Sequence, residues 1–198
     1  TVAAVNDAPV ASNASDSTNE DTAVDITLSA TDVEGSSLTY SVVATNNGSV
    51  SINGTTATYT PTANYNGTDT FTYKANDGTD DGNTATVTIT IAAVQDAPTT
   101  SNVSASTNED TAKAISLSGA DVDSDDTLTY SIVSDVSNGS TSLSGSTVTY
   151  TPTANWNGTD TFTYKVNDGT VDSNTSTVTV TVAAVNDAPV ASNASDST

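Results

Sequence analysis

The chain repeats itself on two scales. Residues 1–18 recur unchanged as residues 181–198, which sets a period of 180 residues. Inside that period, the Val-Asn-Asp-Ala-Pro segment at 5–9 returns with one substitution at 94–98 and unchanged at 185–189. The period therefore holds two units, of 89 and 91 residues. We expect two similar domains in line, followed by the start of a third.

A longer match supports duplication of whole domains. Residues 59–79 equal residues 150–170 at all but two of 21 positions, where Tyr65 and Ala75 are replaced by Trp156 and Val166. We place the domains at residues 6–94 and 95–185, with the first strand of a third, truncated repeat at 186–198.

Composition narrows the classes of partner. The chain has 24 carboxylates and three lysines, so its net charge is −21. That charge repels nucleic acid and anionic membrane surfaces, and it favours cations. The chain contains no Cys, His or Met, which removes the usual ligands of zinc and of softer metals. Oxygen-seeking ions such as Ca²⁺ remain as the natural inorganic partner.

Apolar residues alternate with Thr, Ser or Asp along most of the chain. Val24, Ile26 and Leu28 show this period of two, as do residues 85–91. The pattern predicts β-strands with one face in a core, and no segment has helical spacing. With a leading strand near residues 9–14, each unit has about seven short strands bounded by Gly, Asn and Asp. This organisation predicts an all-β sandwich.

The junction between the units is very short. Residues 94–97 lie directly between the last strand of one unit and the first strand of the next, and Pro98 ends the ladder there. The segment has no flexible Gly/Ser tether. We therefore expect adjacent domains to be held close, end to end.

Carboxylates recur at matching places in the two units. One interpretation is that Asp residues decorate turns and keep an acidic surface soluble. The other is that clustered carboxylates bind a hard divalent cation, for which calcium, with six to eight oxygen ligands, fits best. Recurrence alone does not decide between them, because duplicated domains also duplicate their turns. The matching sets are Glu20/Glu109, Asp32/Asp121, Glu34/Asp123, Asp69/Asp160, Asp77/Asp168 and Asp7/Asp96/Asp187.

The positions of these residues resemble the calcium-binding scheme of cadherins. Asn19-Glu20, the Asp32-x-Glu34 motif, Asn76-Asp77-Gly78 and the Asn-Asp-x-Pro segments follow the order of a cadherin repeat. The chain is also similar to the cadherin-like tandem repeats of large bacterial surface proteins and adhesins. This resemblance implies tandem seven-stranded, cadherin-like (immunoglobulin-like) Greek-key β-sandwiches arranged end to end, with calcium bound where they meet.

The resemblance also implies a ligand set. Ala93 stands at the first acidic position of the cadherin linker, and the Asp-Arg-Glu motif is missing, so fewer ions per junction are expected. The complete junction is predicted to use Glu20, Asp69, Gln95, Asp96, Asp121, Asp123 and Asp168. Half-built outer sites are predicted at Asp7, Asp32, Glu34 and Asp77, and at Glu109, Asp160 and Asp187.

Catalysis has little support in the sequence. Without His or Cys, neither a nucleophile–base pair nor an activated thiol is available. We predict a calcium-stiffened spacer of an extracellular or cell-surface bacterial fibre that projects a distal binding region. The alternative is a module that binds polysaccharide, or partner copies in head-to-tail self-association. Tyr65 and Trp156 could offer a sugar-stacking platform, although a plug at the bottom of the sandwich is favoured.

Overall fold

The computed structural model describes residues 5–123 and 126–189, and these form two compact units, Thr1–Gln95 and Asp96–Thr198. The predicted first strand of a third repeat, at 186–198, lies outside the described residues from position 190 onward. All regular elements in the described part of the chain are strands. Unit 1 contains β1 (Val10–Ala11), β2 (Ala14–Asn19), β3 (Val24–Thr27), β4 (Ala30–Thr31), β5 (Thr39–Thr45), β6 (Gly48–Asn53), β7 (Thr56–Pro61), β8 (Gly67–Asn76) and β9 (Ala85–Ala92).

Unit 2 repeats the same order of strands. Its elements are β10 (Thr99–Thr100), β11 (Val103–Asn108), β12 (Lys113–Ser116), β13 (Gly119–Ala120), β14 (Thr129–Ser134), β15 (Gly139–Ser144), β16 (Thr147–Pro152), β17 (Gly158–Asn167) and β18 (Ser176–Ala183).

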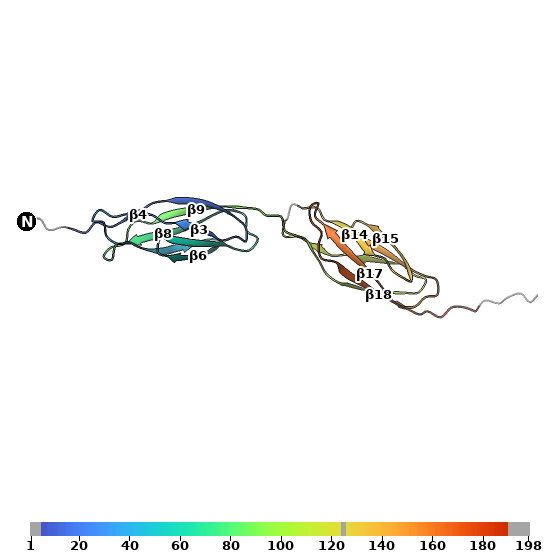
Figure 1. Ribbon diagram of the computed structural model, residues 1–198. Helices are drawn as coiled ribbons and strands as arrows, with labels where there is room; N and C mark the ends of the chain where they lie inside the picture. The colour runs from blue at the N-terminus through green and yellow to red at the C-terminus, as the bar shows by residue number, and fades with distance from the viewer. Residues whose placement is uncertain (1–4, 124–125, 190–198) are drawn as a thin grey trace, which may run out of the picture. The chain divides into compact units, whose positions relative to one another are not determined.

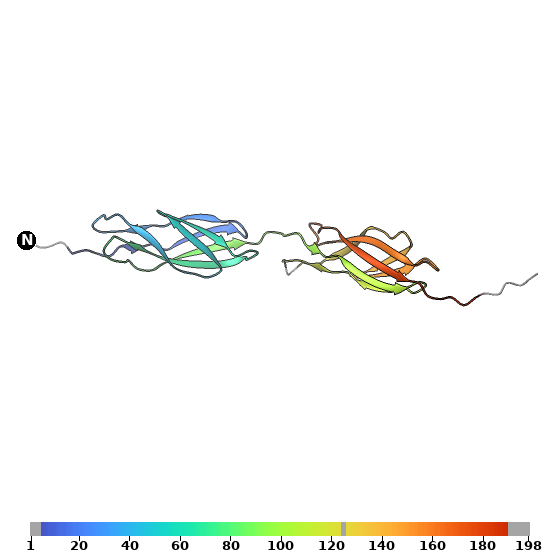
Figure 2. The same ribbon diagram turned by 90° about the horizontal axis from the view of Figure 1, so that it is seen from below.

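Each unit is a sandwich of a four-stranded and a three-stranded sheet. In unit 1 the sheets have the orders β2-β9-β8-β5 and β3-β7-β6, and in unit 2 they have the orders β11-β18-β17-β14 and β12-β16-β15 (Figures 1 and 2). In each four-stranded sheet, the strand that comes first in the sequence runs parallel to the strand that comes last. β2 lies beside β9, and β11 lies beside β18. All other pairs are antiparallel. The prediction of an all-β tandem sandwich is confirmed.

The core of each unit lies between its two sheets, and the inward faces of the two longest strands contribute much of it. Along β8 the side chains of Phe71 and Tyr73 are buried, and along β9 those of Val87 and Ile89 are buried, while the Thr residues between them are partly exposed. Unit 2 repeats this pattern on β17 and β18. The period of two therefore identified the core face correctly, because alternate residues of a strand face opposite sides.

The leading segment differs from the single strand that the sequence predicts. It divides into β1, which pairs with β4, and β2, which pairs with β9. Asn13 lies between the two strands, and its Oδ1 accepts a hydrogen bond from the amide of Thr86 at 2.8 Å. Because this side chain takes the place of a ladder bond, the backbone can pass from one sheet to the other at that residue.

A buried tyrosine fixes this crossing. The hydroxyl of Tyr73 lies 2.6 Å from the carbonyl oxygen of Ser12 and 2.9 Å from that of Ser29. Tyr164 repeats the arrangement in unit 2. Burial raises the pKa of Tyr73, so its hydroxyl remains protonated and available as a donor.

Tyr65 and Trp156 pack against the cores of their units. Each side chain is partly buried. This placement agrees with the plug that the sequence favours over an exposed sugar-stacking platform.

Candidate cation site

Three carboxylates of unit 2 converge at the end where its chain begins. Asp121 follows β13, Asp168 follows β17, and Asp126 lies in the loop that leads to β14. Each of the three offers a carboxylate oxygen, and these oxygens all lie within 4.8 Å of one another. We call this group, Asp121, Asp126 and Asp168, the acidic triad.

Hydrogen bonds to the backbone hold two members of the triad. Asp168 is buried, and its Oδ1 accepts the amides of Thr170 and Val171, each at 2.6 Å, which forms a turn closed by the side chain. The Oδ1 of Asp121 accepts the amide of Asp123 at 3.1 Å. These bonds fix the direction in which the remaining oxygens point.

The second oxygen of Asp121 has no hydrogen-bond partner. Asp121 Oδ2 is buried, and it is one of two side-chain polar atoms in the described part of the chain with this property. A buried oxygen without a partner costs free energy, and a nearby carboxylate of the same charge raises that cost. A bound cation would remove both costs.

The start of unit 2 is tied to the same region. The amide of Asp96 donates to Asp123 Oδ2 at 2.8 Å. Gln95, which precedes it, is the last residue of unit 1. The structure therefore brings Asp96 and Asp123 together within unit 2, beside the acidic triad.

Unit 1 has a related but less acidic group. Asp32 Oδ2 is the other buried oxygen without a partner, and Asp32 Oδ1 accepts the amide of Ser36 at 2.8 Å. Ser36 stands where unit 2 has Asp126, because the unit 2 loop is one residue longer. The amide of Asp7 donates to Glu34 Oε2 at 3.3 Å, as Asp96 does to Asp123.

An amide side chain replaces part of the acidic character in unit 1. Asn6 Nδ2 donates to Asp77 at 2.8 Å and to Asp80 at 3.0 Å. Hydrogen bonds from the amide of Asp80, from Asn6 and from the amide of Thr79 lower the pKa of Asp77. Asp77 is thus held as a carboxylate by neutral donors.

Two buried glutamates lie at the opposite ends of the units. Glu20 follows β2 and accepts the amide of Val94, and Glu109 follows β11 and accepts the amide of Val185 at 2.6 Å. Both side chains are buried. Each glutamate therefore fastens the strand that leaves its unit. Asp187 is exposed.

Asp69 and Asp160 serve the interior of their own sandwiches. Asp69 is buried and accepts hydrogen bonds from Tyr59 Oη at 2.6 Å, from the amide of Asn47 at 3.0 Å and from the amide of Thr70 at 2.7 Å. Asp160 makes the corresponding bonds in unit 2. With both carboxylate oxygens engaged inside the domain, we leave these two residues out of the ligand set that we propose.

The tyrosine that faces Asp160 predicts a dependence of stability on alkaline pH. Burial, and then the negative charge of Asp160, raise the pKa of Tyr150 to about 12, whereas an unfolded tyrosine ionises near 10. The contribution of protonated Tyr150 to the free energy of unfolding is complete below about pH 10, and it is lost as the pH rises to about 12. Denaturant titrations of unit 2, followed by the fluorescence of Trp156, should show this fall. Tyr150→Phe should make this fall in stability smaller. An equal fall in both proteins would show that Tyr150 does not cause it.

Sequence reasoning missed Asp126. The signal was the extra residue in the loop of unit 2, where an Asp-x-Asp motif is followed by another carboxylate three residues later. The pairing of Tyr59 with Asp69 was also missed, because the two residues lie on different strands and no local pattern joins them.

A comparison with family models covers nearly the whole chain. The model described as bacterial Ig domain matches residues 6–90 and 95–181. The chain belongs to the bacterial Ig domain family. It consists of cadherin-like tandem repeats of a bacterial protein.

Solved structures similar to these bacterial Ig domains include cadherin fragments. Human protocadherin-24 EC1-2 has a TM-score of 0.59 at 16% identity, with 90% of this chain and 99% of that chain covered. Mouse cadherin-23 EC22-24 has a TM-score of 0.56 at 21% identity, with 90% and 65% covered. At these identities the likeness shows the fold.

Another match, an endo-fucoidan hydrolase from glycoside hydrolase family 107, has a TM-score of 0.40 at 20% identity, and the bacterial Ig domains span 29% of its length. No curated protein matches the chain. The described residues include no helix that could span a lipid bilayer.

Proposed function

We propose that these bacterial Ig domains form a calcium-stiffened spacer of an extracellular adhesin or surface fibre, which projects a distal binding region. The single observation that carries the proposal is the acidic triad, in which a buried oxygen of Asp121 lacks a partner beside two more carboxylates. Domains of this family are typically extracellular and non-catalytic, which agrees with this role.

Calcium suits this donor set better than other ions. The donors are all oxygens, and the chain has no Cys or His to bind zinc. Calcium accepts six to eight oxygen ligands in flexible geometry, while magnesium demands a strict octahedron and gives up its waters reluctantly. Extracellular modules bind calcium with dissociation constants of roughly 10⁻⁴ to 10⁻³ M, and we expect that range here.

We propose a wider ligand set than the triad, following the cadherin resemblance. The set includes the carboxylates that cluster in unit 2, and we propose that the buried glutamate that follows β2 joins them from unit 1. The proposed junction set is Glu20, Gln95, Asp96, Asp121, Asp123, Asp126 and Asp168. Partial sites are proposed at Asp7, Asp32, Glu34 and Asp77, and at Glu109 and Asp187.

The surface supports a spacer better than a sugar-binding module. The exposed large hydrophobic side chains of the described residues are all valines, with no aromatic among them. Tyr65 and Trp156, the candidates for stacking on a sugar, pack against the cores instead. A polysaccharide site usually needs such a platform, so this surface gives it no evident anchor.

Small-angle scattering of the full chain tests the spacer. With calcium, we expect a narrow distribution of interdomain distances, and with a chelator a broader one, because ligands from both sides of the linker no longer share an ion. Asp121→Ala should behave in calcium as the wild type does in chelator. Asp25→Ala is the matched control, since it removes an exposed carboxylate of β3 that bonds to Thr58. Scattering curves that do not respond to calcium would refute the stiffening.

A further inference from the structure

Unit 2 carries an open groove between the edges of its two sheets. β11 is the edge strand of the four-stranded sheet, and β12 is the edge strand of the three-stranded sheet. The groove between them has a volume of about 570 Å³. A second hollow of about 500 Å³ adjoins it and shares Ser106 and Lys113 with it. Both edges of the groove therefore present backbone that is paired on one side only.

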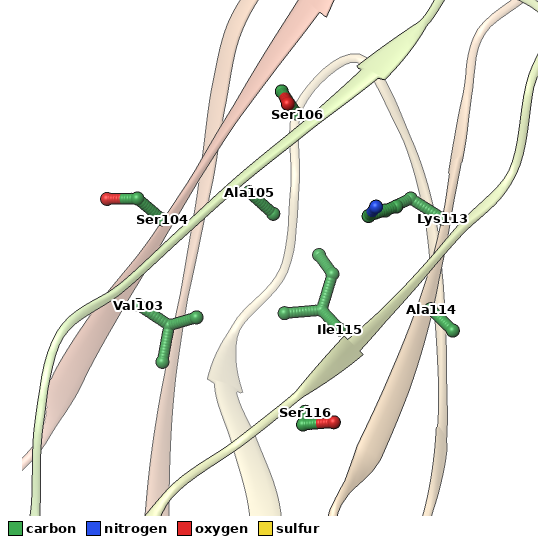
Figure 3. Close-up of a pocket in the computed structure, with 8 residues that line it drawn as sticks. All are labelled: Val103, Ser104, Ala105, Ser106, Lys113, Ala114, Ile115 and Ser116. Carbon is green, nitrogen blue, oxygen red and sulfur yellow. The ribbon is translucent and has the colours of Figure 1, made fainter.

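Small side chains leave this backbone accessible. In Figure 3, Val103, Ala105 and Ile115 turn into the space between the strands, while Ser104 and Ala114 turn away from it. No residue of β11 is charged, and none is proline. Proteins usually protect edge strands with charges, prolines or bulges, because an open edge can pair with another strand.

The corresponding seam in unit 1, between the edge strands β2 and β3, carries a negative charge that unit 2 lacks. Asp16 pairs in register with Ile89 of β9, at the position that Ala105 holds opposite Val180 in unit 2. An aspartate at a position facing the seam opposes pairing of this edge with another edge that carries negative charge. Its Oδ1 also accepts the amide of Ser17 at 2.8 Å, so it covers a donor of its own strand. Ala105 has no group that could do this.

The two seams also differ in the sign of their charge. Lys113 of β12 is one of three lysines in a chain of net charge −21, and it is exposed, with no ion pair in the described part of the chain. The matching position in unit 1 is Val24. Unit 1 instead carries Asp16 on β2, and its side chain is exposed. One seam is acidic, and the other is basic.

We propose that the groove between β11 and β12 binds the β2 edge of a second copy of this chain, so that a sheet of unit 2 continues into a sheet of the other copy's unit 1. Extended backbone adding to an open edge gives the affinity, and Asp16 facing Lys113 gives the register. Two like seams would set Lys113 against Lys113, or Asp16 against Asp16. Opposed charges therefore select pairing of unlike units.

This contact joins two different surfaces, so it is heterologous. In a pair, such a contact leaves one copy with a free β2 edge and the other with a free groove, and it can therefore propagate from copy to copy. In a longer array with the same period, neighbouring fibres would associate side by side with a stagger of one unit.

Sedimentation velocity of the full chain over a concentration series tests the proposal, in chelator and at about 0.15 M salt, where screening acts over about 8 Å. We expect concentration-dependent association of the wild type. Ala105→Asp sets an aspartate against Asp16 of the other copy, and it should weaken association about tenfold or more. Lys113→Asp should do the same. Lys74→Asp, with an equal change of net charge on β8, should not. A wild type that stays monomeric, or an Ala105→Asp variant that associates normally, would overturn the proposal.

A mixing experiment separates lost recognition from lost folding. Alone, Asp16→Lys presents lysine to the Lys113 groove, and Lys113→Asp presents aspartate to Asp16, so neither should associate. Mixed in equal amounts, the lysine of the first variant meets the reversed groove of the second, and association should return. Its failure to return, with both variants folded by circular dichroism, would refute the pairing of Asp16 with Lys113.

Discussion

Calcium should raise the free energy of unfolding of unit 2 by about 2.7 kcal/mol when the free ion exceeds its dissociation constant a hundredfold. The gain arises because the ion binds the assembled triad and not the unfolded chain. For a domain of this size, each kcal/mol corresponds to roughly 4–8 °C in Tm. Trp156, the single tryptophan of the chain, makes the fluorescence transition specific to unit 2.

Magnesium at the same concentration is the control. It should give a much smaller shift, because it tolerates neither a loose geometry nor a high coordination number. An unfolding transition that is the same in calcium and in chelator would refute calcium binding by the acidic triad.

Asp121→Asn should stabilise unit 2 in chelator and destabilise it in calcium. In chelator the variant should be more stable than the wild type by roughly 1–2 kcal/mol, because the neutral amide no longer repels Asp126 and Asp168 and the unpartnered buried charge is gone. In calcium it should be less stable than the wild type, since most of the gain from the ion is lost. Denaturant titrations of Trp156 fluorescence in both buffers measure the two differences.

Asp32→Asn is the matched control for this sign change. It removes the corresponding buried oxygen in unit 1, where Ser36 replaces the third carboxylate. It should leave the calcium response of unit 2 unchanged. If Asp121→Asn destabilised the chain equally in both buffers, Asp121 would be a structural residue and not a ligand.

The sequence predicted the fold well because apolar residues with a period of two show which side chains of a strand are buried. Val87 and Ile89 on one face and Thr86 and Thr88 on the other can satisfy both solvent and core in a strand, and in no other regular element. The division of the leading strand at Asn13 was not predictable in the same way. The division depends on a hydrogen bond with Thr86, which is far away in the sequence. An asparagine at position 13 does not by itself indicate such a bond.

The strand pattern also predicted part of the candidate site. Asp121 and Asp168 follow strands whose ends lie together, so the strand pattern alone brings them to one end of unit 2. Asp69 has the same chemistry but a different environment, because Tyr59 reaches it from a neighbouring strand and engages its oxygens. Sequence can rank carboxylates by position, but it takes the packed structure to show which oxygens are already in use.

The parallel pairing of the first and last long strands decides how a unit resists force. β2 runs beside β9 from Ala14 opposite Val87 to Asn19 opposite Ala92. Tension on the two ends of a unit pulls these strands in opposite directions along their length, so the hydrogen bonds between them are loaded in shear and together. An antiparallel pair at the same place would open like a zipper, one bond after another. We therefore expect each sandwich to act as a mechanical link that yields late under load.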